Sequence, residues 1–139
     1  MKTRMLGRME VSAMLVAALL TVPIGSAIGM GCMGMSHAAG KPMDMDEAAR
    51  IIREAVDMGY TFFDTAKNYG YAGDPNHNEK ILGKALSGIR EKVVIASKCG
   101  VDFDYSVDPD VPPLIYDSSR EGIRKSVEGS LKRLNGSRH

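Results

Sequence analysis

The chain has 139 residues, 44% hydrophobic and 25% charged, and its 18 lysines and arginines nearly balance 17 aspartates and glutamates. These values indicate at most one soluble globular domain, and they exclude disordered chains, collagen-like chains and strongly basic nucleic-acid binders. Cys32 and Cys99 are too few and too far apart for a disulfide framework, so we expect reduced thiols. His37 and His77 have no neighbours at ligand spacing, so we expect no metal site.

The N-terminal part contains a long uncharged segment. From Val11 to Gly40 there is no Asp, Glu, Lys or Arg, and residues 14–24 are almost continuously apolar. Basic residues precede this segment and small residues follow it at 25–27, as in a cleaved signal peptide. Pro23 and the glycines beyond it interrupt any membrane-spanning helix.

Several interpretations of this segment stay open. Residues 1–27 could be an export signal, residues 11–30 could associate with a membrane, or the segment could be a buried strand or packed helix. We expect a cytoplasmic protein, with export or membrane association as the alternative.

A glycine motif ends the uncharged segment. Residues 29–34 match GxGxxG, the dinucleotide-binding fingerprint. The fingerprint has to open a helix, but Gly40 and Pro42 predict a loop here. We therefore interpret the glycines as a strand end followed by a tight loop that passes close to something bound.

Beyond Pro42 the sequence predicts a helix and then a strand. Asp44 and Glu47 form a capping box, and Gly59 provides the stop. The short aromatic run at 61–63 predicts a buried strand that ends in Asp64. The helix has apolar residues at helical spacing: Ala48, Ile51, Ile52, Ala55 and Val56.

The same unit then repeats. Asn76 and Glu79 form a second capping box, and Gly88 ends the second helix. Residues 93–96 predict a parallel strand that is covered on both faces.

A third helix follows a long proline-containing loop. Ser118 and Glu121 predict its cap, and its excess of basic residues indicates a solvated face. Strands that alternate with amphipathic helices indicate right-handed βαβ units, in a doubly wound sheet or a barrel. The predicted core stripe of this helix is Ile123, Val127, Leu131 and Leu134.

Asp64, Tyr69 and Lys98 lie at or just beyond the carboxyl ends of predicted parallel strands, where α/β proteins place their sites. Tyr69 can donate a proton to a carbonyl that accepts hydride, if a neighbouring cation favours its ionisation. Lys98 is the candidate cation, and Asp64 is the carboxylate that would hold it charged and oriented. The alternative is that all three are ordinary strand-end and loop residues.

The sequence around these residues resembles the aldo-keto reductase family. The segments are FDTAKNYG at 63–70, NEKILGKAL at 78–86 and VIASK at 94–98. Shorter similarities lie at 3–8, 31–36 and 130–134. The resemblance implies a (β/α)8 barrel that binds NADPH and reduces aldehydes or ketones with an Asp, Tyr, Lys and His tetrad. Asp64, Tyr69 and Lys98 take the first three places, and Gly31, Cys32 and Met33 are the implied cofactor contacts.

The chain also departs from the family pattern. We expect an α/β fold that is the N-terminal part of a TIM-type barrel, with about three βα units, truncated before strand four. Its parts would be a hairpin-like segment at 1–13, an apolar insertion or possible signal region at 14–29, and a partial barrel at 30–139. His139 does not match the family's catalytic histidine.

These departures define the functional expectation. We expect NADP-dependent chemistry on a small-molecule carbonyl, with the isolated chain inactive and no nucleic-acid partner. The alternatives are a non-catalytic fragment that pairs with a separate C-terminal half or with itself through its open sheet edge, and an exported remnant.

Overall fold

The structure is a computed structural model that describes residues 25–38 and 40–135. The predicted segment at 1–13 and most of the apolar segment at 14–29 therefore lie outside the described residues. In chain order the elements are β1 (Met30–Gly31), a 3-10 turn (Met33–Met35), α1 (Met45–Asp57), β2 (Phe62–Asp64), α2 (His77–Ala85), a 3-10 turn (Arg90–Lys92), β3 (Val94–Ala96), β4 (Val101–Phe103), β5 (Leu114–Tyr116) and α3 (Arg120–Arg133).

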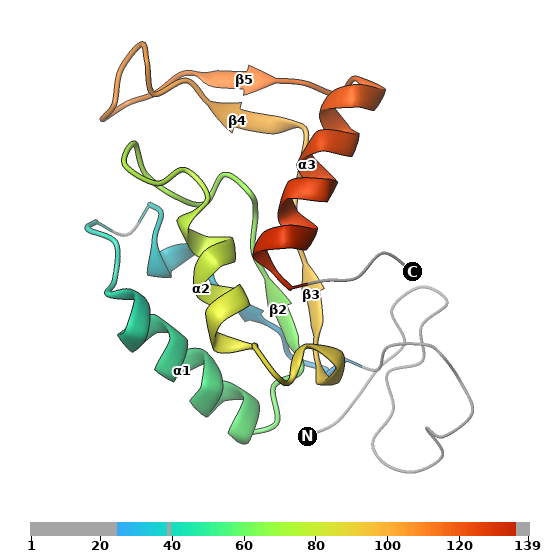
Figure 1. The fold of residues 1–139 in the computed structure, drawn as a ribbon. Helices are drawn as coiled ribbons and strands as arrows, with labels where there is room; N and C mark the ends of the chain where they lie inside the picture. The colour runs from blue at the N-terminus through green and yellow to red at the C-terminus, as the bar shows by residue number, and fades with distance from the viewer. Residues whose placement is uncertain (1–24, 39, 136–139) are drawn as a thin grey trace.

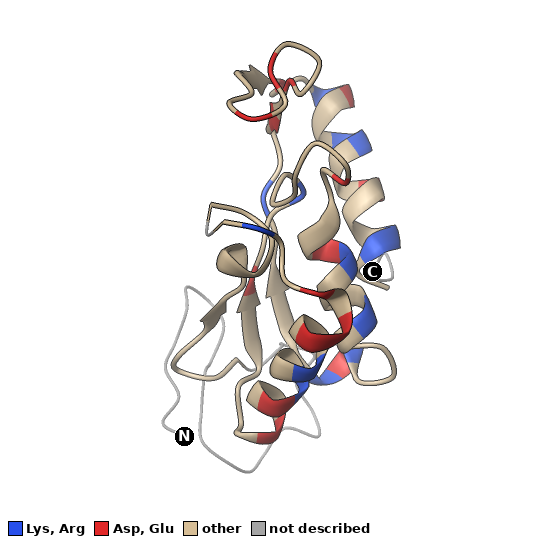
Figure 2. Cartoon of the chain, turned by 90° about the vertical axis from the view of Figure 1, so that its left-hand side faces the viewer, with Lys and Arg blue, Asp and Glu red and all other residues tan. Residues whose placement is uncertain are grey.

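The centre of the fold is a parallel sheet in the order β1-β2-β3 (Figure 1). Phe63 of β2 pairs with Met30 on one side and with Ile95 on the other. α1 joins β1 to β2 and α2 joins β2 to β3, so the predicted alternation of helix and strand is confirmed. The three helices lie on one side of this sheet, as Figures 1 and 2 show together.

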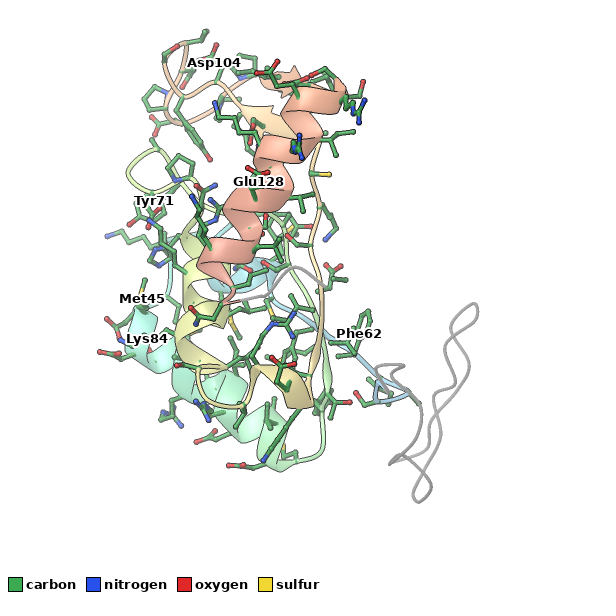
Figure 3. All side chains as sticks on the ribbon, turned by 45° about the vertical axis from the view of Figure 1, so that its right-hand side comes forward. Met45, Phe62, Tyr71, Lys84, Asp104 and Glu128 are labelled. Carbon is green, nitrogen blue, oxygen red and sulfur yellow. The ribbon has the colours of Figure 1, made fainter. Side chains whose placement is uncertain are left out.

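The hydrophobic core lies between the sheet and the helices. Phe63 is fully buried there and belongs to one core cluster with Ile52 of α1 and Ile81 and Leu82 of α2. Lys84 of α2 pairs with Asp46 in the first turn of α1, beside Met45 in Figure 3. None of the described helices is long and apolar enough to cross a membrane.

Residues next to the two ends of α1 predict correctly where this helix begins and ends. The Asp44 carboxylate accepts hydrogen bonds from the backbone N–H groups of Asp46 and Glu47, as an N-cap does. Gly59 follows the helix at φ +94°, a conformation that costs glycine little, so the predicted stop is confirmed. The predicted apolar face packs into the core.

The predicted cap of α2 is wrong. Asn76 makes no side-chain cap, because its amide donates to the Lys67 carbonyl oxygen at 2.6 Å. Glu79 is fully buried and contacts Ser97 and Arg133 instead of the helix end.

Two further expectations about packing are also corrected. The residues of β3 are half-buried and not covered on both faces. Ile123 and Val127 of the predicted α3 stripe are 39% and 45% exposed, because α3 turns Ser126 toward the interior.

The cap of α3 and the loop before it differ as well. Ser119, and not Ser118, caps α3 by accepting from the Gly122 N–H at 3.0 Å. The long loop contains an antiparallel hairpin, β4–β5, that was not predicted from the sequence.

Candidate active site

The carboxyl ends of the parallel strands bring the three predicted residues together. Asp64 is the last residue of β2, Lys98 lies just beyond β3, and Tyr69 lies in the loop after β2. The Lys98 ammonium donates to Asp64 Oδ1 at 2.6 Å and to the Thr65 carbonyl oxygen at 2.8 Å. The same ammonium lies 4.7 Å from the centroid of the Tyr69 ring. One cation therefore contacts both the carboxylate and the phenol ring.

The electrostatics of this group favour a charged lysine. Partial burial by itself would lower the pKa of Lys98, but Asp64 and Tyr69 raise it, and the net shift is upward. Lys98 thus keeps its proton at neutral pH. The side chains of Lys98 and Asp64 are 48% and 43% exposed, so the group is open to a ligand from solvent.

The predicted cofactor contacts differ in accessibility. Cys32 is fully buried, and its backbone N–H donates to the Asp64 carbonyl oxygen at 2.9 Å. Burial, with a smaller effect from Asp64, raises the pKa of the Cys32 thiol to about 12. Gly31 is exposed with open space where a Cβ would lie, and Met33 is 40% exposed. Of the three residues, only Gly31 and Met33 are exposed, Gly31 through its backbone and Met33 through its side chain.

A buried polar network supports the loop that carries Tyr69. The Thr65 hydroxyl donates to Asn78 Oδ1 at 2.7 Å, and Asn78 Nδ2 donates to the Ser36 hydroxyl at 2.6 Å. The Ser36 hydroxyl in turn donates to the Tyr69 carbonyl oxygen at 2.8 Å. The loops after β1 and β2 are therefore joined beneath the site.

The supporting roles of Ser36, His37 and Asn78 were not predicted from the sequence. His37 lies in the loop after β1, and its ring stacks on the Tyr69 ring with centroids 5.8 Å apart. The signal that identified Asp64 and Lys98, a polar residue beyond a parallel strand, also applies to His37. No group of three or more His, Cys, Asp or Glu among the described residues could hold a metal ion.

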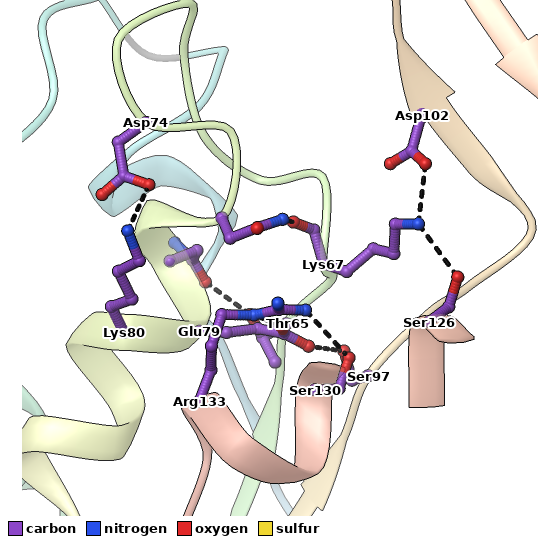
Figure 4. Close-up of polar contacts among 12 residues, drawn as sticks. Thr65, Lys67, Asp74, Glu79, Lys80, Ser97, Asp102, Ser126, Ser130 and Arg133 are labelled. Atoms are coloured by element: carbon purple, nitrogen blue, oxygen red, sulfur yellow. Dashed lines mark hydrogen bonds and ion pairs between the residues drawn. The ribbon is translucent and has the colours of Figure 1, made fainter. Parts of the chain in front are cut away.

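A second charged cluster ties the hairpin and α3 to the Tyr69 loop (Figure 4). Lys67 pairs with Asp102 of β4 at 2.6 Å and donates to the Ser126 hydroxyl of α3 at 2.9 Å. Nearby, Arg133 pairs with the buried Glu79 at 2.6 Å. The Lys67 cluster and Arg133 border a cleft of about 670 Å³. The lining of this cleft does not include Asp64, Tyr69 or Lys98, so the cleft is separate from the candidate active site.

Comparison with known proteins gives a consistent result. The sequence profile described as "Aldo/keto reductase family" matches residues 27–139. A Glycine max protein named "Probable aldo-keto reductase 1" is 38% identical over 110 residues, which are 78% of this chain and 29% of that protein. The chain therefore spans less than a third of that relative's length.

Two solved structures are also similar. An aldo-keto reductase from Bacillus halodurans in its holo form superimposes with a TM-score of 0.72 at 29% identity, over 98% of this chain and 37% of that one. An aldo-keto reductase from Klebsiella pneumoniae in complex with NADPH gives a TM-score of 0.55 at 27% identity, over 81% of this chain and 32% of that one.

Proposed function

Because the chain belongs to the aldo/keto reductase family, we propose that Asp64, Tyr69 and Lys98 act in the NADPH-dependent reduction of an aldehyde or ketone. The observation that carries the proposal is the position of the Lys98 ammonium, 2.6 Å from Asp64 Oδ1 and 4.7 Å from the centroid of the Tyr69 ring. Three consecutive βα units, as in part of a (β/α)8 barrel, place this group at the edge of the sheet where such barrels hold their sites.

Each residue has a distinct role in the proposed reaction. The Tyr69 hydroxyl donates its proton to the carbonyl oxygen as negative charge develops there. The Lys98 ammonium stabilises the phenolate that remains, since opposite charges attract strongly where water is partly excluded. Asp64 keeps Lys98 charged and fixes its direction, so it acts as a positioning residue.

The hydride comes from NADPH, the cofactor bound in the Klebsiella pneumoniae relative. In this chain Gly31 and Met33 would contact the cofactor, because they are exposed at the carboxyl end of β1. The chain spans about a third of the solved relatives' length. We therefore expect the 139 residues alone to hold the proton donor without turning over substrate.

A graft tests the proposed chemistry. Residues 27–139 replace the superimposed part of the Bacillus halodurans reductase, and NADPH oxidation is followed with short aldehydes and ketones. Tyr69→Phe in the graft is expected to lower kcat by about 100-fold or more, and Lys98→Met also lowers it. Lys84→Met, which removes a lysine of similar exposure that lies outside this group and pairs with Asp46 of α1, serves as the control. Equal turnover by the graft and its Tyr69→Phe variant would contradict the proposal.

A second candidate function is pairing with another chain. In the sheet formed by the described residues, β1 and β3 each pair only with β2, so both are edge strands. An open parallel edge can accept a separate C-terminal half or a second copy of the chain. Light scattering on the purified chain, alone and with a co-expressed C-terminal half of a relative, distinguishes the partners. If the chain is a soluble monomer that does not bind the added C-terminal half, this function is contradicted.

The location in the cell is a separate proposal. We propose that the protein is cytoplasmic, with export or membrane association through residues 11–30 as the alternative. N-terminal sequencing of protein from cell fractions tests this. An intact Met1 in the soluble cytoplasmic fraction is expected, and a start near Ile28 in an exported fraction would overturn it.

A further inference from the structure

Tyr69 lies at one end of a row of aromatic rings. The His37 ring is nearly parallel to the Tyr69 ring, with an interplanar angle of 13°, and its other neighbour is Phe103 of the hairpin at 5.1 Å between centroids. Phe103 in turn lies 6.0 Å from Tyr105. In this row of rings, His37 therefore joins the proposed proton donor to the hairpin.

The backbone beside Tyr69 is also held by His37. His37 Nδ1 lies 2.9 Å from the Gly70 carbonyl oxygen, and a carbonyl oxygen can only accept a hydrogen bond. Nδ1 must therefore carry a proton. The adjacent Ser36 donates to the Tyr69 carbonyl oxygen at 2.8 Å, so two successive residues of one loop bind two successive carbonyl groups of the other.

The conformation of this backbone leaves little freedom. Gly70 is buried, and a Cβ added to it would lie 2.2 Å from the Asp74 carbonyl oxygen. The Asn78 N–H, in the first turn of α2, donates to the Tyr69 carbonyl oxygen at 3.0 Å. A change at His37 is thus transmitted to Tyr69 through its ring and to the start of α2 through the backbone.

We propose that His37 is a positioning residue that holds the ring and the backbone of Tyr69 in place beside Lys98. This inference rests on the proposed role of Tyr69 as proton donor. It assigns two separable functions to one side chain: the ring fixes the plane of the phenol, and the Nδ1 proton fixes the carbonyl group of Gly70.

The first test uses the unsubstituted full chain. Long-range 1H–15N correlation NMR of the histidine rings reports which nitrogen carries the proton, and His37→Asn assigns the His37 signal. The expected result at neutral pH is a protonated Nδ1 in His37. A ring protonated only at Nε2 would overturn the proposal, because the hydrogen bond to Gly70 would then be absent.

Two substitutions separate the two functions. His37→Asn keeps an N–H donor near the position of Nδ1 but removes the ring, and His37→Phe keeps a ring but removes the donor. The readouts are the ring 13C–1H signals of Tyr69 and the amide exchange rate of Asn78. Tyr60, near the opposite end of the sheet, provides an internal reference signal. Circular dichroism establishes that each variant is folded.

The expected pattern is reciprocal. His37→Asn shifts the Tyr69 ring signals and leaves Asn78 exchange within about twofold of the parent. His37→Phe leaves the ring signals close to the parent values and accelerates Asn78 exchange about tenfold. If neither variant changes its readout, the proposal is overturned. No readout depends on turnover, so failure here is distinguishable from failure of the Tyr69→Phe test in the graft.

Discussion

Burial separates the chemistry of individual side chains in this protein. Cys32 lies inside the core with no exposed surface, whereas Cys99 is exposed directly after Lys98. Glu79 is a carboxylate with no exposed surface, but Arg133 and Ser97 bind its two oxygens. For Cys32 the buried environment, and not the residue type, decides which protonation state the folded chain prefers.

The two thiols should therefore react at very different rates. The thiolate is the reactive form, and the pKa of Cys32 is raised to about 12. We expect a disulfide reagent at about pH 8 to modify one thiol per folded chain and two after unfolding. Cys99→Ser should abolish the fast reaction, and Cys32→Ser should keep it. Two fast thiols in the folded chain would contradict this.

Removing Arg133, the cationic partner of Glu79, should destabilise the folded chain. Arg133→Met leaves a buried carboxylate without its cation, which is expected to lower the free energy of unfolding by about 3–5 kcal/mol in urea titrations. The control is Arg50→Met in the exposed Arg50–Glu54 pair, whose side chains are 61% and 52% exposed. That substitution should cost less than about 1 kcal/mol. Equal costs for the two substitutions would disprove the role of Glu79 burial.

At the level of elements, helix ends and helix contacts follow different rules. The start of α1 depends on a side chain within its own first turn, so Asp44 could be identified from its neighbours in sequence. The contact between α2 and α3 depends on residues far apart in sequence, because Gly83 allows the Arg133 carbonyl group to approach closely.

Adjacent serines provide a matched test of the α3 cap. Ser119 accepts the hydrogen bond of the Gly122 N–H, and Ser118 precedes it. Ser119→Ala is expected to destabilise the chain by about 1 kcal/mol, while Ser118→Ala should change it by less than about 0.5 kcal/mol. Thermal or urea unfolding measures both. A larger loss for Ser118→Ala would restore the cap that the sequence pattern predicts.

Gly83→Ala should destabilise, although alanine normally favours a helix over glycine by about 1 kcal/mol. The added Cβ would lie 1.9 Å from the Arg133 carbonyl oxygen, a backbone atom that cannot move aside without shifting α3. We expect a loss of about 1–3 kcal/mol in urea unfolding. The control, Gly31→Ala, places its Cβ in open space and should be nearly neutral. A stabilising Gly83→Ala would show that α3 does not pack here.

On the scale of the whole molecule, polar contacts attach the hairpin and α3 to the sheet. Lys67 joins the Tyr69 loop to β4 and α3, and Tyr105 donates to the Gly70 carbonyl oxygen at 3.4 Å. Lys and Arg residues are spread along α3 (Figure 2), a helix of which Ser126 is the one buried residue among those described. α3 is thus held by charge and hydrogen bonds more than by apolar burial.

Alkaline pH should weaken the whole fold. Between the ordinary pKa of 9.0 and about 12, the unfolded chain releases the Cys32 proton while the folded chain keeps it. The free energy of unfolding should therefore fall by about 1.4 kcal/mol per pH unit from this thiol alone. The raised pKa of Lys98 acts in the same direction. The free energy of unfolding, measured by urea titration from neutral pH to about pH 11, should fall less steeply with pH in Cys32→Ala than in the parent chain. The same dependence on pH in both proteins would contradict this.

The sequence by itself determined the features that depend on near neighbours. The alternation of helix and strand, the Asp44 cap and the stop at Gly59 follow from backbone conformation and side-chain spacing within a few residues. The placement of Asp64 and Lys98 also followed, because parallel strands bring their carboxyl ends to one edge.

Only the tertiary structure decided which distant groups meet. The inward turn of Glu79 depends on Arg133, 54 residues away, and the contact of His37 with the Tyr69 loop joins residues 33 apart. A buried charge or ring contacts whichever group the fold brings within a few ångströms, and hydrophobic periodicity does not predict which group that is. For this reason the capping box at Glu79 was predicted wrongly and the position of His37 was missed.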